Sequence, residues 1–207
     1  MKKLTVSLLA LMLIATITVK AQVSLAAKGG LNMSNLYGDE LTDENINFGF
    51  NLGLALDYEF QPAMAVQTGL FFTTKGSKVT REIEDLLSGD FTQTLNYLQL
   101  PVHFAYKYEV MPATRLVFHA GPYIAYGVGG KSELTSGDAS ISSNKVFGDE
   151  PYQYKPFDAG LGLGVGAEFG QFLLDLGWDM GLVNISRIDD GNIKNQNAYL
   201  SIGYRFN

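Results

Sequence analysis

The stretch NYLQLPVHFAYKY, residues 96–108, alternates apolar and polar side chains. Its even positions include Leu98, Leu100 and Phe104, whereas its odd positions include Gln99 and His103. Alternation with a period of two places one set of side chains on each face of a β-strand. The stretch therefore predicts a strand with one apolar face, which either packs inside the protein or faces lipid.

The first 21 residues have the parts of a secretory signal peptide. A basic head precedes an apolar run over residues 4–19, and a small-residue cleavage pattern precedes Gln22. Such a segment is removed on export and takes no part in the fold. A retained membrane anchor is the alternative, but the run is short for a spanning helix. We predict a signal peptide at residues 1–21 and one barrel domain at residues 22–207.

The composition points to an exported all-β protein. Charged residues make up 17% of the chain, below the roughly 25% that is typical of soluble domains, and 23 residues are glycine. Loss of the three lysines of the leader lowers the formal net charge from −6 to −9, which argues against nucleic-acid binding. The absence of cysteine excludes disulfides, thiolate metal sites and a lipid-anchored lipoprotein. No second apolar run is long enough for a spanning helix.

The alternation recurs in eight segments, which we predict to be strands. They are residues 23–31, 46–60, 64–74, 96–108, 116–128, 157–169, 172–182 and 198–206. Short connections with turn residues alternate with long polar connections at residues 32–45, 79–94, 132–154 and 184–197. Short turns at one end and long loops at the other are typical of outer-membrane barrels. The sequence predicts an all-β fold, an eight-stranded antiparallel up-and-down transmembrane β-barrel.

The apolar face of these strands is predicted to face lipid. A soluble barrel of the lipocalin type has its apolar face inward. The apolar faces here carry bulky side chains that a narrow eight-stranded interior does not hold, among them Phe48, Phe50, Phe72, Phe104, Phe118 and Trp178. The polar faces carry few of the Lys, Glu and Thr residues of a wet surface and include a glycine stripe at Gly160, Gly162, Gly164 and Gly166. We read these glycines as space for facing side chains in a cramped lumen.

Several motifs resemble those of the PorT-like outer-membrane β-barrel proteins. They are KGGLN at residues 28–32, TKG at 74–76, NYLQLP at 96–101, AGPY at 120–123, GLVN at 181–184 and SIGYRF at 201–206. The resemblance implies an eight-stranded barrel, integral to the Gram-negative outer membrane and inserted by the outer-membrane assembly machinery, which reads a C-terminal aromatic strand. The family's eponymous member is linked to protein secretion, which makes a secretion accessory an alternative role.

The only two histidines, His103 and His119, fall on polar strand faces. If the turn at residues 110–113 pairs Tyr108 with Thr114, His103 lies opposite His119. Two imidazoles can ligate a metal, but no third ligand is evident nearby, so we favour a histidine pair that fills the lumen and predict no metal or cofactor. The long loops contain no histidine to activate a nucleophile there, and we expect no enzyme.

The connection Gly170–Gln171 predicts a two-residue type II′ turn, because glycine comes first. Counting back from this turn places Gly162 opposite Asp179 and Gly166 opposite Asp175. The glycines would then make room for the carboxylates.

Five charged residues of the polar faces are predicted to converge near the short-turn end: Lys107, Arg115, Glu168, Asp175 and Arg205. The same counting places Lys107 opposite Arg115, with Glu168 on the strand next to Arg115, and places Arg205 on the strand next to Asp175. Each charge offsets an opposite one, and a broken buried pair typically costs about 3–5 kcal/mol. We predict a structural charge cluster that plugs the lumen.

The long loops hold fourteen of the 21 acidic residues, and none has the spacing of an EF-hand. One explanation for these acidic residues is that they keep exposed loops soluble. The more specific alternative is that they contact anionic lipopolysaccharide through divalent cations or form a ligand-binding surface. A loop carboxylate pair such as Asp189–Asp190 is the one formal route to catalysis.

The predicted function is structural or surface-interacting, in contact with outer-membrane lipid and lipopolysaccharide. A small porin-like channel is the alternative.

Overall fold

The computed structural model describes residues 22–38, 44–83, 87–136, 139–150, 153–188 and 191–206. Its strands are β1 (Gln22–Gly38), β2 (Glu44–Gln61), β3 (Met64–Ile83), β4 (Leu87–Met111), β5 (Thr114–Ser136), β6 (Ala139–Ser143), β7 (Phe157–Phe169), β8 (Phe172–Gly181) and β9 (Ile193–Arg205). The predicted signal peptide lies outside the described residues. Within these ranges no helix has the length and apolar character needed to span a bilayer.

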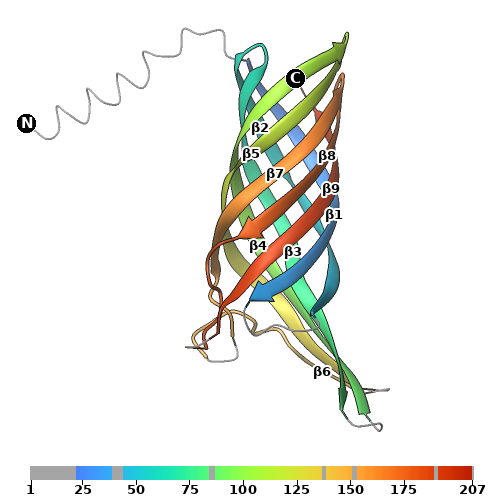
Figure 1. Cartoon of the computed structure of the whole chain (residues 1–207), viewed down its shortest axis with the longest axis vertical. Coiled ribbons are helices and arrows are strands. Elements are labelled where there is room, and N and C mark those ends of the chain that lie inside the picture. Colours follow the sequence, from blue (N-terminus) through green and yellow to red (C-terminus); the bar gives the residue numbers. More distant parts are fainter. Residues whose placement is uncertain are drawn as a thin grey trace, which may run out of the picture.

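Eight of these strands form a closed antiparallel barrel (Figure 1). β1, β2, β3, β4, β5, β7, β8 and β9 each pair with the next, and β9 pairs with β1 to close the ring. β6 pairs only with the far end of β5 and lies outside the ring. The eight-stranded up-and-down barrel predicted from the sequence is confirmed.

The two ends of the barrel differ in their connections. Two-residue turns at residues 62–63, 112–113 and 170–171 lie at one end, which we call the turn end and which is uppermost in Figure 1. The remaining connections lie at the opposite end, which we call the loop end. At the turn between β7 and β8, Gly170 has a φ of 60°, as the type II′ turn requires at its first position.

The strands extend further toward the loop end than predicted. β3 continues to Ile83 and β4 begins at Leu87, so most of the predicted loop at residues 79–94 is a hairpin. β5 continues to Ser136. Polar side chains take the outward positions of these extensions, for example Thr94 opposite Lys131, so the apolar alternation that marks the lipid-facing part is missing while the backbone ladder continues.

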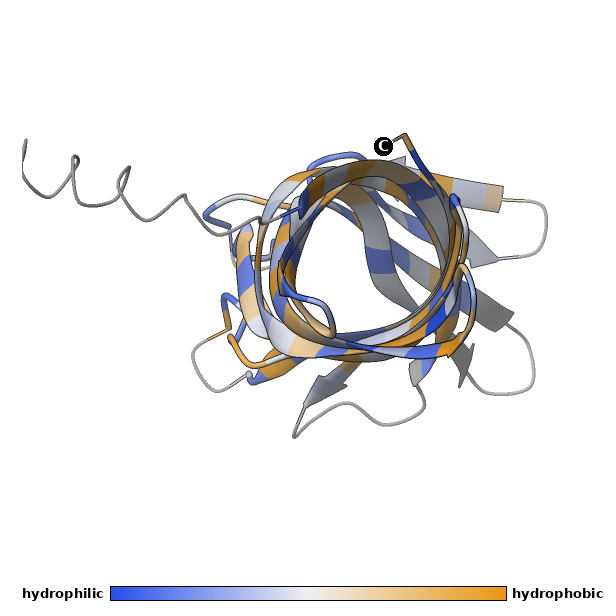
Figure 2. Ribbon diagram, turned by 90° about the horizontal axis from the view of Figure 1, so that it is seen from above, coloured by the Kyte–Doolittle hydropathy of each residue, from blue (hydrophilic) through white to orange (hydrophobic). Residues whose placement is uncertain are grey.

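Apolar side chains point away from the barrel and polar side chains point into it. Leu31 is 68% exposed, Phe48 74% and Ile202 69%, whereas the adjacent Asn32 and Ser201 are 0% and 3% exposed. Figure 2, viewed along the barrel, shows hydrophobic and hydrophilic residues alternating around the ring. An oily outer surface over a polar lumen is the arrangement of a membrane-spanning barrel. The predicted direction of the apolar face is confirmed.

The predicted register is right at one turn and wrong at another. Across the turn between β7 and β8, Gly162 pairs with Asp179, as predicted. Across the turn between β4 and β5, Lys107 pairs with Val117 and not with Arg115. The ladder shifts register beside this second turn, next to Met111. Because the error is two residues, every side chain keeps its predicted face.

Candidate functional site: the barrel lumen

The lumen contains a cavity of about 100 Å³, which is large enough for several water molecules. Its lining runs from Ser24 and Arg205 near the turn end to Gln99, Asp179 and Asn197 deeper in the barrel. Several groups of side chains surround this cavity or lie beyond it in the barrel, and each draws residues from several strands.

The first group is an ion network near the turn end, which we call the turn-end network: Asp57, Glu59, Lys107, Arg115, Glu168 and Arg205. Lys107 is only 2% exposed. Its Nζ atom lies 2.7 Å from both Asp57 and Glu59 and 3.0 Å from Glu168. Three carboxylates therefore surround one buried ammonium group.

The two arginines complete the turn-end network. The Arg115 Nε atom donates to Glu168 at 2.8 Å, and the Arg115 Nη2 atom lies 2.9 Å from Glu59. The Arg205 Nη2 atom lies 2.6 Å from Glu168. The network thus contains three cations and three anions, and charge-assisted bonds of this kind are the strong class of hydrogen bond.

The structure brings together Lys107, Arg115, Glu168 and Arg205, four of the five residues of the predicted charge cluster. Asp175 does not join them, because it pairs with Ser201 of β9 and not with Arg205, so it lies deeper in the barrel. Asp57 and Glu59 fall on the polar face of the predicted strand at residues 46–60, but they are not part of the predicted cluster. They reach Lys107 across the lumen, and counting between neighbouring strands does not find such contacts.

The second group is built around the two histidines, which we call the histidine layer: Lys28, His103, His119 and Asp175. The Nδ1 atoms of His103 and His119 lie 3.0 Å apart, and the rings stack with centroids 5.1 Å apart. His119 Nε2 lies 2.9 Å from Asp175 Oδ1, and the Lys28 Nζ atom donates to Asp175 Oδ2 at 2.8 Å. His119 pairs with Ala105, so the predicted direct opposition of the histidines is wrong and they are diagonal neighbours.

The glycine stripe gives the two imidazole rings their space. A Cβ atom added at Gly162 would lie 2.8 Å from His103 Nε2, and one added at Gly164 would lie 2.5 Å from His119 Nε2. Both distances are shorter than real contacts of a Cβ atom. Any larger residue at either position would displace the ring that faces it.

Next toward the loop end is a buried lysine. Lys75 is 0% exposed, and its Nζ atom lies 3.2 Å from Asp158. The same atom lies 4.3 Å from the ring centroid of Tyr123 and 5.5 Å from that of Tyr97. Ring faces attract a desolvated cation, so the tyrosines stabilise the ammonium group together with Asp158.

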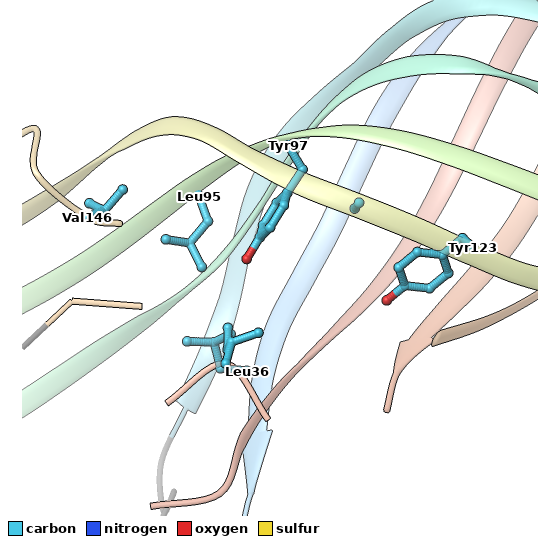
Figure 3. Close-up of a cluster of buried hydrophobic side chains, with 7 residues drawn as sticks. Leu36, Leu95, Tyr97, Tyr123 and Val146 are labelled. Atoms are coloured by element: carbon cyan, nitrogen blue, oxygen red, sulfur yellow. The ribbon is translucent and has the colours of Figure 1, made fainter. Parts of the chain in front are cut away.

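The third group is an apolar cluster at the loop end, which we call the loop-end cluster. It consists of Leu36, Leu95, Tyr97, Tyr123, Ala125, Val146 and Ile185, and five of its members are labelled in Figure 3. Val146 and Ile185 come from connections between strands and not from the barrel wall. Backbone hydrogen bonds hold these connections: Ile185 donates to Ile193, and Lys155 donates to Ile185.

The loop-end cluster was not predicted from the sequence. Tyr97 and Tyr123 did fall on the polar, inward faces of their strands, and two large aromatic rings on that face are a signal of packing inside the lumen. Their partners Val146 and Ile185 lie in segments without any periodicity, and only the fold brings these residues over the barrel.

Residues 19–187 match the protein family described as outer membrane protein beta-barrel domain. The chain belongs to this family. A closed barrel with an apolar outer surface agrees with that membership, and the protein is an integral outer-membrane protein.

Solved structures of outer-membrane proteins are similar to the chain at low identity. Ail, the attachment invasion locus protein of Yersinia pestis, is 20% identical over 89% of this chain and 99% of that chain, with a TM-score of 0.43. Neisserial surface protein A is 11% identical over 89% and 99%, with a TM-score of 0.46. OprG from Pseudomonas aeruginosa is 16% identical over 88% and 95%, with a TM-score of 0.42. A search of curated protein sequences finds no match to the chain.

Proposed function

We propose that this member of the outer membrane protein beta-barrel domain family is a closed, non-conducting barrel with a structural or surface-interaction role. The observation that carries the proposal is the loop-end cluster. Leu95, Tyr97 and Ile185 are each 0% exposed, although a water-filled channel along the lumen would wet them. The turn-end network supports the proposal, because Lys107 and its three carboxylate partners hold strands from opposite sides of the barrel together.

The loop end is the proposed site of interaction with the cell exterior. Long loops of outer-membrane barrels face outward, and short turns face the periplasm. Asp149 and Glu150 are exposed in the connection between β6 and β7, and Asp149 is paired with Arg187 at 2.9 Å. Acidic side chains there suit contact with lipopolysaccharide phosphates through divalent cations. We assign no catalytic role.

Two finer assignments belong to the same proposal. The motifs at residues 96–101 and 201–206 support membership of the PorT-like group. The aromatic end of β9, at Tyr204 and Phe206, supports insertion by the outer-membrane assembly machinery. An accessory role in protein secretion is the alternative that the PorT-like resemblance favours.

A small porin-like channel is the second candidate, and the lumen cavity of about 100 Å³ favours it. Conduction would require a path past the loop-end cluster.

Liposome swelling separates the two candidates: vesicles that contain the refolded protein are diluted into an isotonic sugar solution. The closed barrel predicts swelling no faster than that of protein-free vesicles. Swelling that increases with the amount of protein and decreases with sugar size would overturn the closed barrel.

A further inference from the structure

Asp179 is a buried carboxylate on β8. It is 3% exposed, and its Oδ2 atom accepts a hydrogen bond from Gln99 Nε2 at 2.8 Å. The other buried carboxylates each have a lysine or arginine nitrogen within 3.2 Å: Asp57, Asp158, Glu168 and Asp175. Among the described residues no such nitrogen lies within 4.0 Å of Asp179. An ionised carboxylate at this depth needs a positive charge or several donors.

The histidine layer determines which nitrogen of His103 carries a proton. The Asp175 carboxylate is paired with Lys28 and accepts, so His119 Nε2 donates to it. In neutral His119 the Nδ1 atom is then the acceptor, and His103 Nδ1 must donate to it across their 3.0 Å contact. The remaining nitrogen, His103 Nε2, therefore has an unprotonated lone pair.

This lone pair has no partner in the described structure. His103 is 6% exposed, and its Nε2 atom is buried without a hydrogen-bond donor. The Nε2 atom and Asp179 Oδ1 lie 2.8 and 2.6 Å from the position of a Cβ atom at Gly162, so both are directed to the same part of the lumen. Gln99 Oε1 is also buried and unpartnered, and its orientation is fixed because its amide nitrogen donates to Asp179.

We propose that His103 and Asp179 bind one divalent transition-metal cation such as Zn²⁺. An imidazole nitrogen beside a carboxylate is a donor pair that zinc and its neighbours in the periodic table accept. The His103 Nδ1–H group is held by a further hydrogen bond, as is usual for a ligating histidine, and this bond orients the ring. The cation also offsets the charge of Asp179.

Amide oxygen and water complete the coordination. The described residues contain no group of three His, Cys, Asp and Glu side chains around one point. We include Gln99 Oε1 in the proposal as the third protein ligand, because this oxygen is buried and unpartnered and its side chain is bonded to Asp179. Access is through the lumen cavity, whose lining includes Ser24 near the turn end as well as His103 and Asp179. The proposed site therefore lies in the wall of this cavity and not in the loop-end cluster.

Metal binding to the whole folded barrel tests the proposal. The protein is refolded in detergent without a polyhistidine tag, treated with a chelator and titrated with Zn²⁺ in a calorimeter. We expect one saturable site per barrel. Either His103→Gln or Asp179→Asn should weaken binding by at least about tenfold. Glu133→Gln is the matched control and should bind as the unchanged protein does, because Glu133 is a partly exposed carboxylate on β5 that does not line the lumen cavity.

A spectroscopic measurement keeps the test decisive if a variant fails to fold. In ¹⁵N spectra of the unchanged protein, we expect His103 to be protonated at Nδ1 alone, and Zn²⁺ to shift the Nε2 resonance of His103. Absence of saturable binding, binding that survives both substitutions, or a His103 ring protonated at both nitrogens before metal is added would each overturn the proposal.

Discussion

The Glu168 carboxylate on β7 lies 3.0 Å from the Nζ atom of Lys107 on β4, although β5 separates these two strands in the sheet. The contact crosses the lumen and ties together strands that share no backbone hydrogen bonds. Arg205 of β9 meets the same carboxylate at 2.6 Å. One side chain thereby links three separate parts of the barrel wall.

Glu168→Gln should destabilise the barrel by about 3–5 kcal/mol, because loss of one partner leaves buried cations uncompensated. The free energy of unfolding is measured by urea titration in lipid vesicles, with the single tryptophan, Trp178, as the fluorescent reporter. Glu109→Gln is the matched control, since Glu109 is exposed at the same end of the barrel. Equal stability of the two variants would show that the turn-end network contributes little.

The outer surface is tested at Leu176, which is 53% exposed near the middle of β8. Leu176→Arg should lower the free energy of unfolding by roughly 2–4 kcal/mol if this position lies at the bilayer midplane. Leu176→Met preserves the apolar contact with lipid and should cost less than about 1.5 kcal/mol. Tolerance of arginine equal to that of methionine would contradict the assignment of this face to lipid.

The fold itself followed from side-chain alternation, because a barrel in lipid must be apolar outside along every strand. Alternation also assigned the inward face correctly where the register was wrong. The pairing of β4 with β5, the strands of His103 and His119, differs from the predicted pairing by two residues. Because this difference is an even number, both rings stay in the lumen. Strand ends were less predictable, since beyond the membrane the backbone ladder of β4 and β5 continues without an apolar face.

The lumen was predicted only in part, because its contacts are set by closure of the ring. Neighbour counting correctly placed Glu168 beside Arg115, which pair across β5 and β7. Counting along neighbouring strands could not show that Glu59 of β2 contacts Lys107 of β4, because these strands are not paired. The loop-end cluster depends on Ile185, whose position follows from loop folding and not from strand periodicity.

The turn between β4 and β5 contains a strained residue. Ala113 has a φ of 60°, a left-handed conformation that costs residues with a Cβ atom about 1–2 kcal/mol. Ala113→Gly removes this strain, but glycine also loses more conformational entropy when the chain folds. The net effect should be a free energy of unfolding that is higher by up to about 1 kcal/mol. Ala63→Gly is the control: Ala63 also follows a proline in a two-residue turn, but its φ is not positive. That change should destabilise, and equal effects would contradict strain at Ala113.

Orientation in the outer membrane is tested by labelling, which is straightforward because the chain contains no cysteine. Ser142→Cys lies on exposed β6 at the loop end, and Gln171→Cys lies at the turn end. A membrane-impermeant thiol reagent should label the first variant on whole cells and the second only after the cells are opened. The reverse pattern would place the loop end in the periplasm.

Single-channel recording in a planar bilayer tests the closed lumen most directly. Leu95→Ala combined with Ile185→Ala removes two fully buried side chains of the loop-end cluster and provides the matched, opened variant. We predict that the unchanged protein gives no discrete current steps and that the double variant gives them. Steady steps from the unchanged protein, of the same size as those from the double variant, would contradict a closed barrel.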